Sequence, residues 1–238
     1  TYSSGFWPTE GISTDQKLRP LIALNEYEEI IIQNTPLMIL YPDILYDLHR
    51  NRISYTLNNL SQVNQEGTPR FIFAHVYIPH PPFVFDRNGN HVRVPRGFIK
   101  YDADGYRLKG GTTAEYQTMY SAQIDYLFEE IIMMIDEIMA ASEDQPIIII
   151  QGDHGPGSTI TQHEFDPDNL DERFSILNTF YFPDQDYQML YPEITPVNTF
   201  RVVFNQFFGE HLEQLPDRNF YSTVMRPYDF SELSADLQ

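Results

Sequence analysis

The chain of 238 residues contains no cysteine. This absence excludes disulfide bonds, thiolate metal sites and a cysteine nucleophile. It does not identify the compartment, because a protein that works outside the cytoplasm can also lack thiols. Any metal ligands in this chain must therefore be oxygen or nitrogen atoms.

Basic residues are scarce. The chain has 15 Lys and Arg against 34 Asp and Glu, which gives a formal net charge of −19 at pH 7. Nucleic acids and anionic membranes are polyanions, so this charge argues against both as partners. A solvated acidic surface is the ordinary explanation of such a balance.

Long hydrophobic runs are also missing. No apolar run approaches ~18 residues, and the N-terminus lacks the features of a signal peptide, so we expect a soluble chain. The chain begins Thr1-Tyr-Ser-Ser-Gly-Phe6 without Met, which indicates a part of a longer protein. Its length and its 42% hydrophobic residues predict one domain over residues 1–238 with a packed core.

The hydrophobic pattern predicts alternating helices and strands. We expect helices at 26–34, 41–64, 115–142 and 195–208, and strands at 71–78, 147–150 and 174–182. Residues 86–111 are expected to form a long surface loop. A strand, a long crossover helix and a second strand form a βαβ unit, which is parallel in nearly every case. The sequence therefore predicts an α/β fold with a mostly parallel sheet and helices on both faces.

An acid and an imidazole follow the four isoleucines of the strand at 147–150, in Gly152-Asp-His-Gly155. Open α/β sheets bind ligands and metals at the edge where their strands end. Asp153 and His154 supply ligands that suit a divalent ion such as Zn²⁺ or Mn²⁺. The flanking glycines let the backbone turn sharply and let a ligand come close. We know of no structural purpose for this pair, which predicts a metal site.

Two further histidines are candidates for the same site. His80 lies in Ile-Pro-His-Pro-Pro82, just after the strand at 71–78, and His163 lies in Thr161-Gln-His-Glu-Phe165. In a βαβ unit the ends of the two strands meet, so His80 and His154 are expected at one sheet edge. An imidazole can donate to phosphate or sulfate oxygens, or act as an acid or base near neutral pH.

The other candidate residues have ordinary structural explanations. A lone loop histidine is usually polar surface, and we interpret His49, His91 and His211 in this way. His75 alternates within the strand at 71–78, so it is expected in the core or beside a site residue. Asp102-Ala-Asp-Gly105 has part of a calcium-loop pattern but lacks the full ligand set, so a turn is expected.

These motifs together resemble the sulfatase-like branch of the alkaline phosphatase superfamily. The resemblance spans roughly residues 71–209. It includes Gly152-Asp-His-Gly155 after an apolar strand, the segment from Phe71 through Pro79-His-Pro-Pro82 to Asp86, the helix that follows Tyr120-Ser-Ala-Gln-Ile-Asp125, and the closing helix from Pro196 to Gly209. It is similar above all to membrane-anchored members related to lipoteichoic acid synthase and phosphoethanolamine transferases.

The resemblance implies a metal-dependent hydrolase or transferase of phosphate or sulfate esters. Asp153 and His154 would bind one divalent metal ion (Mn, Zn or Ca), and His80 and His163 would bind the substrate. The substrate would be a small anionic ester or a lipid- or glycan-linked phosphate or sulfate. The family's early acid and its Ser, Thr or formylglycine nucleophile lie upstream of the segments that match. The resemblance thus implies the C-terminal portion of a catalytic domain, truncated on its N-terminal side and inactive alone.

Two alternatives remain open at this stage. The chain could be a non-catalytic, sulfatase-like module that binds a ligand or partner. It could also be a small hydrolase that uses His80 as the base and Ser158 or Thr159 as the nucleophile, although no oxyanion hole is evident. A truncated sheet would expose an apolar edge, so a homo-oligomer is also expected. The resemblance implies a membrane-anchored parent with an extracytoplasmic catalytic domain.

Overall fold

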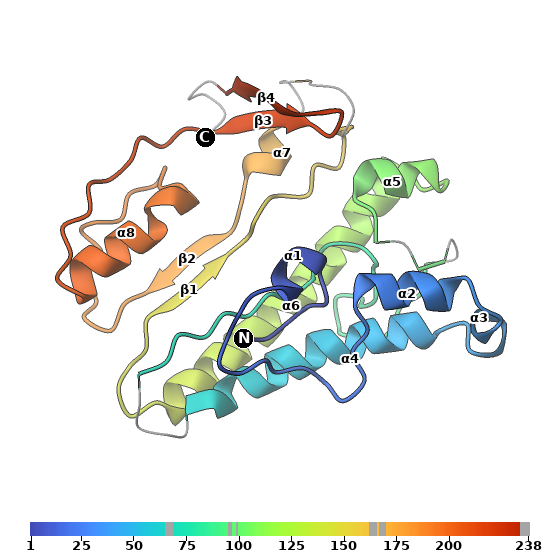
Figure 1. Ribbon diagram of the computed structural model, residues 1–238, viewed down its shortest axis with the longest axis horizontal. Coiled ribbons are helices and arrows are strands. Elements are labelled where there is room, and N and C mark those ends of the chain that lie inside the picture. The colour runs from blue at the N-terminus through green and yellow to red at the C-terminus, as the bar shows by residue number, and fades with distance from the viewer. Residues whose placement is uncertain (65–68, 95–96, 99, 162–165, 167–169, 234–238) are drawn as a thin grey trace. The chain divides into compact units, whose positions relative to one another are not determined.

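The computed structural model describes the chain except residues 65–68, 95–96, 99, 162–165, 167–169 and 234–238 (Figure 1). The chain divides into two compact units, residues 1–144 and residues 145–238. Each unit is described by itself below. The expectation of one domain over residues 1–238 stays a prediction.

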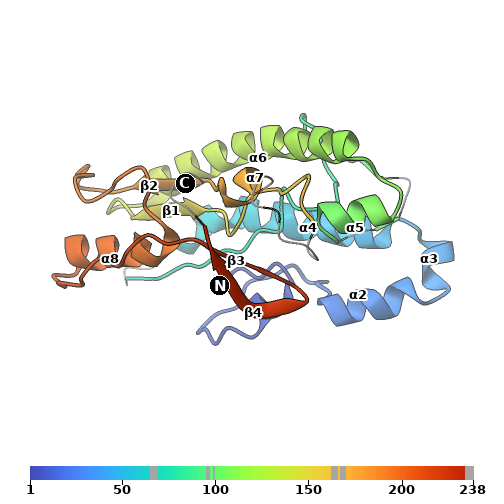
Figure 2. The ribbon, with the colours of Figure 1, turned by 90° about the horizontal axis from the view of Figure 1, so that it is seen from above.

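The described part of the first unit is helical. Its elements are α1 (Trp7–Glu10), α2 (Glu26–Gln33), α3 (Leu37–Leu40), α4 (Ile44–Asn59), the 3₁₀ helix η1 (Leu60–Asn64), α5 (Ala103–Leu108) and α6 (Thr113–Ala141). Seen from above, α4 lies between α6 and α2 (Figure 2). The helices expected at 26–34, 41–64 and 115–142 are thus confirmed. The loop expected at 86–111 contains α5.

Polar side chains cap the starts of α2, α5 and α6. The Thr112 hydroxyl accepts a hydrogen bond from Glu115 N at 3.1 Å at the start of α6. Asn25 and Glu28 form a capping box at the start of α2. Asp102 caps α5, and its carboxylate also accepts from the Tyr116 hydroxyl at 2.8 Å. The Asp102 to Gly105 motif is therefore the start of helix α5, where the sequence analysis expected a turn.

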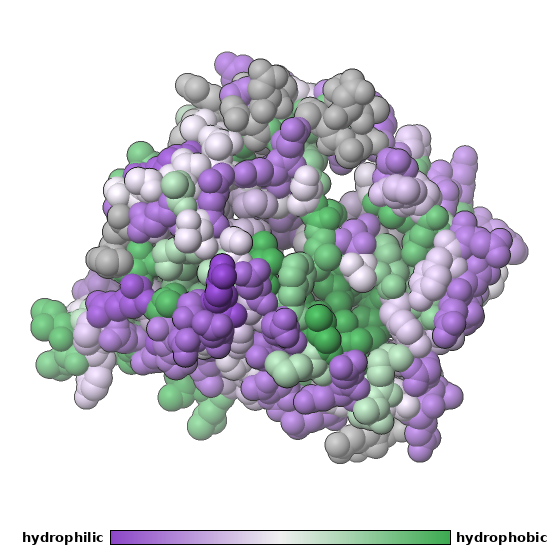
Figure 3. All heavy atoms as spheres, turned by 180° about the vertical axis from the view of Figure 1, so that it is seen from behind, coloured by the Kyte–Doolittle hydropathy of each residue, from purple (hydrophilic) through white to green (hydrophobic). Residues whose placement is uncertain are grey.

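Aromatic and aliphatic side chains from α4, α6 and the segment at 78–85 form the core of the first unit. One cluster contains Tyr46, Ile53, Leu57, Ile78, Val84 and Phe85. A second contains Phe83, Val94, Ala103, Tyr106 and Tyr116. Burial of such side chains supplies most of the stabilisation of a domain this size. The helix α6 still leaves Phe128, Ile132 and Met133 exposed, and uncovered apolar atoms are visible among polar ones in Figure 3.

The segment at 71–78 is extended but forms no strand of a sheet. Its ladder contact is one isolated bridge between Ala74 and Tyr2. Tyr2 N donates to Phe73 O at 2.8 Å, and His75 N donates to Tyr2 O at 3.2 Å. An alternating apolar pattern predicts an extended backbone but does not specify its partner. The expected strand at 71–78 is therefore wrong.

The second unit contains short strands and helices. Its elements are β1 (Ile148–Gln151), α7 (Asp171–Phe174), β2 (Asn178–Tyr181), α8 (Pro196–Phe207), β3 (Phe220–Thr223) and β4 (Arg226–Glu232). The strand expected at 147–150 and the helix expected at 195–208 are confirmed. The strand expected at 174–182 corresponds to β2, which is shorter and begins only at Asn178. The first residue of the expected strand, Phe174, is the last residue of α7.

The predicted parallel sheet is wrong. The described residues form two antiparallel two-stranded sheets, β1 with β2 and β3 with β4. Ile148 pairs with Tyr181, and Gln151 pairs with Asn178. The chain reverses direction between β1 and β2, so β2 runs antiparallel to β1. The βαβ inference failed because its first strand has no sheet partner.

In the described part of the chain, no helix is both long and apolar enough to cross a bilayer.

Asp217 connects the start of α8 to the segment that follows it. Its carboxylate accepts hydrogen bonds from Thr195 N at 2.8 Å, the Thr195 hydroxyl at 2.6 Å, the Asn198 amide at 3.1 Å and the Tyr191 hydroxyl at 2.5 Å. Burial alone would raise the pKa of Asp217, but these hydrogen bonds outweigh it and hold the pKa below its usual value. The carboxylate therefore stabilises the start of α8 in its ionised form.

We expect Asp217→Ala to lower the free energy of unfolding of the second unit by about 2–3 kcal/mol, because several charge-assisted hydrogen bonds are lost together. Urea denaturation of both proteins measures this difference. The exposed Asp229 is the matched control, and Asp229→Ala should change stability by less than about 0.5 kcal/mol. Because the folded pKa is depressed, the Asp217 contribution should be present at neutral pH and lost as pH falls through that pKa. Equal stabilities of the two variants would contradict this assignment.

Candidate functional site

The turn that carries Asp153 and His154 is attached to α7 and the segment after it. Strand β1 ends at Gln151, and Gly152 N then donates to Leu177 O at 2.9 Å. Three residues later, Gly155 N donates to Arg173 O at 2.7 Å. Backbone hydrogen bonds thus fix both ends of the turn, so Asp153 and His154 project from a defined position at the end of β1.

Gly155 is required by this packing. A Cβ atom at Gly155 would lie 1.7 Å from Glu172 O and 2.7 Å from Ser175 O, which are backbone atoms. A Cβ atom at Gly152 would lie 3.7 Å from its nearest neighbours, an ordinary contact. The sequence predicted that the glycines make room for a ligand. In the structure, Gly155 makes room for α7.

The His154 side chain is fixed in one tautomer when neutral. Its Nδ1 lies 2.9 Å from Gly155 O. A carbonyl oxygen only accepts, so Nδ1 carries the proton and Nε2 carries the lone pair. This is the pattern of metal-binding histidines, whose second nitrogen donates to a backbone carbonyl or a carboxylate.

Asp153 and His154 face each other across the turn. The distance from His154 Nε2 to Asp153 Oδ2 is 3.7 Å, and the two side chains are 33% and 72% exposed. Asp153 Oδ1 accepts from His154 N at 3.0 Å, which orients the carboxylate. Metal ions lie about 2 Å from nitrogen and carboxylate ligands. Two ligand atoms that are 3.7 Å apart can therefore bind one ion between them. Carboxylate and imidazole groups are both ligand types that divalent metals accept.

The described residues contain no group of three or more His, Asp or Glu side chains that could hold a metal ion. A site with two protein ligands binds an ion less tightly than one with four. His163 lies outside the described residues, so its role stays a prediction. Within the described part, Asp153 and His154 are thus a ligand pair rather than a full site.

Two charged residues of α7 that the sequence analysis missed contact this turn. Glu172 Oε2 accepts from Ser158 N at 2.6 Å, and Arg173 Nη1 donates to Gly155 O at 3.2 Å. The carbonyl of Gly155 therefore accepts from both Arg173 and His154. In the sequence these residues belong to the charged triplet Asp171-Glu-Arg173, just before the strand expected at 174–182. Glu172 and Arg173 contact the turn and the residues after it only because α7 packs against them.

Ser158 does not fit the role of a nucleophile. The residue is fully buried, so a substrate cannot reach it in this structure. Thr159 is exposed but belongs to the second unit, whereas the expected base His80 belongs to the first. The small-hydrolase alternative therefore loses one of its two proposed nucleophiles.

His80 lies in the first unit, at the end of the extended segment. Its Nδ1 lies 2.7 Å from Pro81 O, so the proton of the neutral ring is again on Nδ1. The ring packs against Tyr77, with centroids 4.6 Å apart. The fully buried Gln123 of α6 fixes the backbone on both sides: its amide donates to Pro79 O at 3.0 Å, and its oxygen accepts from Val84 N at 2.8 Å.

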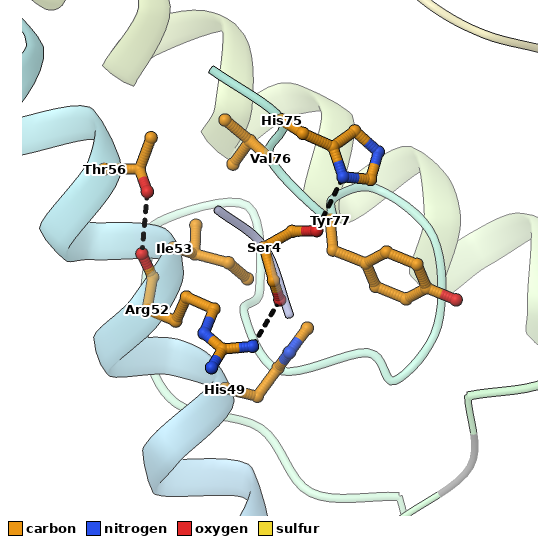
Figure 4. A pocket seen from close by; sticks show the side chains of 8 residues that line it. All are labelled: Ser4, His49, Arg52, Ile53, Thr56, His75, Val76 and Tyr77. Carbon is orange, nitrogen blue, oxygen red and sulfur yellow. Dashed lines mark hydrogen bonds between the residues drawn. The ribbon is translucent and has the colours of Figure 1, made fainter. Parts of the chain in front are cut away.

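Side chains of the N-terminal segment, of α4 and of the extended segment lie around Tyr77, among them Ser4, Arg52 and His75 (Figure 4). His75 Nδ1 lies 2.6 Å from the Ser4 hydroxyl. Arg52 donates to Ser4 O at 2.5 Å and to Leu24 O at 2.6 Å, which fixes the N-terminal segment against α4. His75 is partly buried, and its ring lies beside that of Tyr77, with centroids 6.4 Å apart.

The interpretation of His49 as polar surface is wrong. Its side chain is buried against the Tyr77 and Phe98 rings, and its Nε2 has no hydrogen-bond partner among the described residues. Burial, together with the charges of Lys100, Arg52 and His80, lowers the pKa of His49 well below its usual value. His49 is therefore neutral at physiological pH. His91 and His211 are exposed, as expected.

Lys100 adds a cation to this cluster. Its Nζ lies 2.6 Å from Glu29 Oε2 and 5.5 Å from the centroid of the Tyr77 ring. Burial raises the pKa of Glu29 despite this ion pair. The structure thus brings His80 together with Tyr77, His49 and Lys100 in the first unit, and Asp153 together with His154 and Arg173 in the second.

No protein-family model, no curated protein and no solved structure matches the chain.

Proposed function

We propose that the chain carries metal-binding and substrate-binding groups of an enzyme that hydrolyses or transfers phosphate or sulfate esters. The observation that supports this proposal is the pairing at the end of β1. The Asp153 carboxylate and the lone-pair nitrogen of His154 lie 3.7 Å apart, and a hydrogen bond to Gly155 O fixes the tautomer of the histidine. Carboxylate and imidazole ligands suit Mn²⁺ or Zn²⁺.

Each residue has a distinct role in this proposal. A bound divalent metal ion would polarise the ester and offset its negative charge. Asp153 and His154 hold that ion. His80 of the first unit stays a proposed substrate-binding imidazole, because a protonated imidazole can donate to phosphate or sulfate oxygens. Tyr77 and Gln123 position His80. His163 remains a proposed second imidazole for the substrate.

Metal binding by the chain tests the ligand pair. The electron paramagnetic resonance signal of free Mn²⁺ reports the bound fraction during a titration. We expect Asp153→Asn and His154→Gln each to weaken Mn²⁺ binding by about tenfold or more, because each removes one of two protein ligands. The exposed His91 provides the control, and His91→Gln should leave the affinity unchanged. Equal affinities in all four proteins would show that the turn does not bind the ion.

Ester hydrolysis tests the reaction. The natural protein in which residues 1–238 occur is assayed with p-nitrophenyl phosphate, bis(p-nitrophenyl) phosphate and p-nitrophenyl sulfate, with and without Mn²⁺ or Zn²⁺. The proposal predicts metal-dependent release of p-nitrophenol from at least one of them, lost in Asp153→Asn. Metal binding without hydrolysis of any ester would favour the alternative, a non-catalytic binding module. Two protein ligands in the described residues are the observation consistent with that alternative.

A further inference from the structure

We propose that the outer surface of α2 and α3 binds a helix of a partner protein, one with apolar side chains on one face and Lys or Arg beside them. Helix α2 lies on the side of α4 that is away from α6, and α3 follows α2 and contacts it (Figure 2). This α2–α3 surface consists of six large apolar side chains that are 47–82% exposed: Tyr27, Ile30, Ile31, Ile39, Leu40 and Tyr41.

Helix α2 places a charge inward and apolar side chains outward. Glu29 is only 8% exposed, and its carboxylate lies 2.6 Å from Lys100 Nζ. On the same helix, Tyr27, Ile30 and Ile31 lie three and four residues apart and form one exposed apolar stripe. A surface helix ordinarily has the opposite orientation, with its apolar stripe facing the core. The stripe therefore contributes to stability only when another molecule covers it.

The extent of the α2–α3 surface is that of a protein interface. Aromatic side chains bury roughly 150–250 Å² each and aliphatic ones somewhat less, so the six side chains expose on the order of 600 Å² at their exposed fractions. A standard interface buries about 800 Å² on each partner. Apolar patches of this size on soluble proteins usually mark an interaction site.

Charge decides which occupant fits this surface. From residue 20 to residue 49 the sequence has no Lys or Arg, but it has five acids: Glu26, Glu28, Glu29, Asp43 and Asp47. The ion pairs of the described residues engage the last three of these acids, but neither Glu26 nor Glu28. Lys or Arg of a partner would complement these two carboxylates. A second copy would instead bring a second net charge of −19, and an anionic membrane would also be repelled.

A helical peptide made only of Leu and Lys, with its leucines on one face, serves as the probe. Fluorescence anisotropy of the labelled peptide measures its binding to the full chain at about 0.15 M salt. We expect Ile30→Gln to weaken binding by about tenfold, because an apolar anchor of the interface is lost. Met225, which is 72% exposed in the second unit, gives the matched control, and Met225→Gln should bind as the wild type does. Glutamine favours helices, so Ile30→Gln should keep the circular dichroism spectrum of the wild type.

The charge requirement is tested separately. Replacing Glu26 and Glu28 together by Gln should weaken peptide binding by about threefold, because exposed charges each contribute little. Glutamine can keep the hydrogen bond that Glu28 accepts from Asn25 N, so the cap of α2 is retained. Glu210→Gln, at an exposed acid of the second unit, is the control and should not change binding. A peptide of Leu and Glu with the same pattern should not bind measurably, and equal binding of the two peptides would overturn the choice of a cationic partner.

Three further results would overturn the proposal. The first is a Leu–Lys peptide that does not bind, or that binds Ile30→Gln as tightly as Met225→Gln. The second is a dimer of the chain in sedimentation velocity that Ile30→Gln abolishes, which would assign the surface to a second copy. The third is flotation of the chain with phosphatidylcholine vesicles that Ile30→Gln abolishes, which would assign the surface to lipid. Peptide binding by a monomeric chain that requires both Ile30 and the carboxylates supports the proposal.

Discussion

Replacement of Gly155 by alanine is expected to abolish tight attachment of the Asp153–His154 turn to α7. A methyl group at this position would lie 1.7 Å from Glu172 O, so the turn and α7 must separate. The hydrogen bond from Gly155 N to Arg173 O would be lost, and with it the connection between Arg173 and Gly155 O. We expect the free energy of unfolding to fall by about 2–3 kcal/mol, as for other overpacked sites. Mn²⁺ affinity should fall with it by about tenfold.

Gly152→Ala is the matched control, because the same substitution three residues earlier meets only ordinary contacts at 3.7 Å. Its stability and Mn²⁺ affinity should stay near those of the wild type, since an alanine that fits without strain is tolerated. Urea denaturation and Mn²⁺ titration of the two variants give the comparison. If Gly155→Ala were as stable as Gly152→Ala, the close packing of α7 on the turn would be wrong.

Acid is expected to destabilise the first unit through His49. In the folded state the pKa of this buried histidine is lowered, whereas in the unfolded chain it takes its ordinary value near 6.5. Above that value the ring is neutral in both states, so His49 adds no pH dependence. Below it, the unfolded chain binds a proton that the folded chain does not. The free energy of unfolding should therefore fall by up to about 1.4 kcal/mol per pH unit as pH drops below 6.5.

His49→Phe isolates this contribution, since it keeps a buried aromatic ring but cannot be protonated. Urea denaturation at pH 7.5, 6.0 and 5.0 should show a steeper loss of stability in the wild type than in His49→Phe. Other titrating groups, including Glu29, are present in both proteins and cancel in the difference. The exposed His211 supplies a control, and His211→Gln should retain the wild-type slope. Parallel pH profiles of wild type and His49→Phe would contradict the neutral, buried state of His49.

The sequence predicted helices better than it predicted their assembly. Helix α6 was found because its apolar residues recur over many turns and Thr112 caps its start. Strand β1 was found because four isoleucines favour an extended backbone. The parallel sheet was wrong because an alternating pattern at 71–78 does not say whether a sheet partner exists. That segment bonds to Tyr2, some seventy residues away, and no local signal specifies this pairing.

The candidate site, too, could be predicted from local sequence signals but not from the long-range contacts that hold it. Asp153 and His154 could be identified because an acid and an imidazole follow shortly after the apolar strand β1. Arg173 contacts the same turn at Gly155 and Glu172 contacts the nearby Ser158, yet both lie about twenty residues later and have the composition of an ordinary surface turn. His49 was misjudged because its burial depends on Tyr77 and Phe98, which pack on α4 from distant segments. Long-range packing of this kind leaves no periodic signal in the sequence.

The central claim is that Asp153 and His154 form a divalent metal pair, and proton nuclear magnetic resonance of the seven histidines tests it most directly. Substoichiometric Mn²⁺ broadens the Cε1–H signals of residues close to the bound ion. We predict that the His154 signal broadens first, that those of His91 and His211 remain sharp at the same Mn²⁺ concentration, and that Asp153→Asn shifts the broadening of His154 to higher concentrations. Broadening of His91 or His211 before His154, or equal broadening of His154 in Asp153→Asn, would contradict the claim.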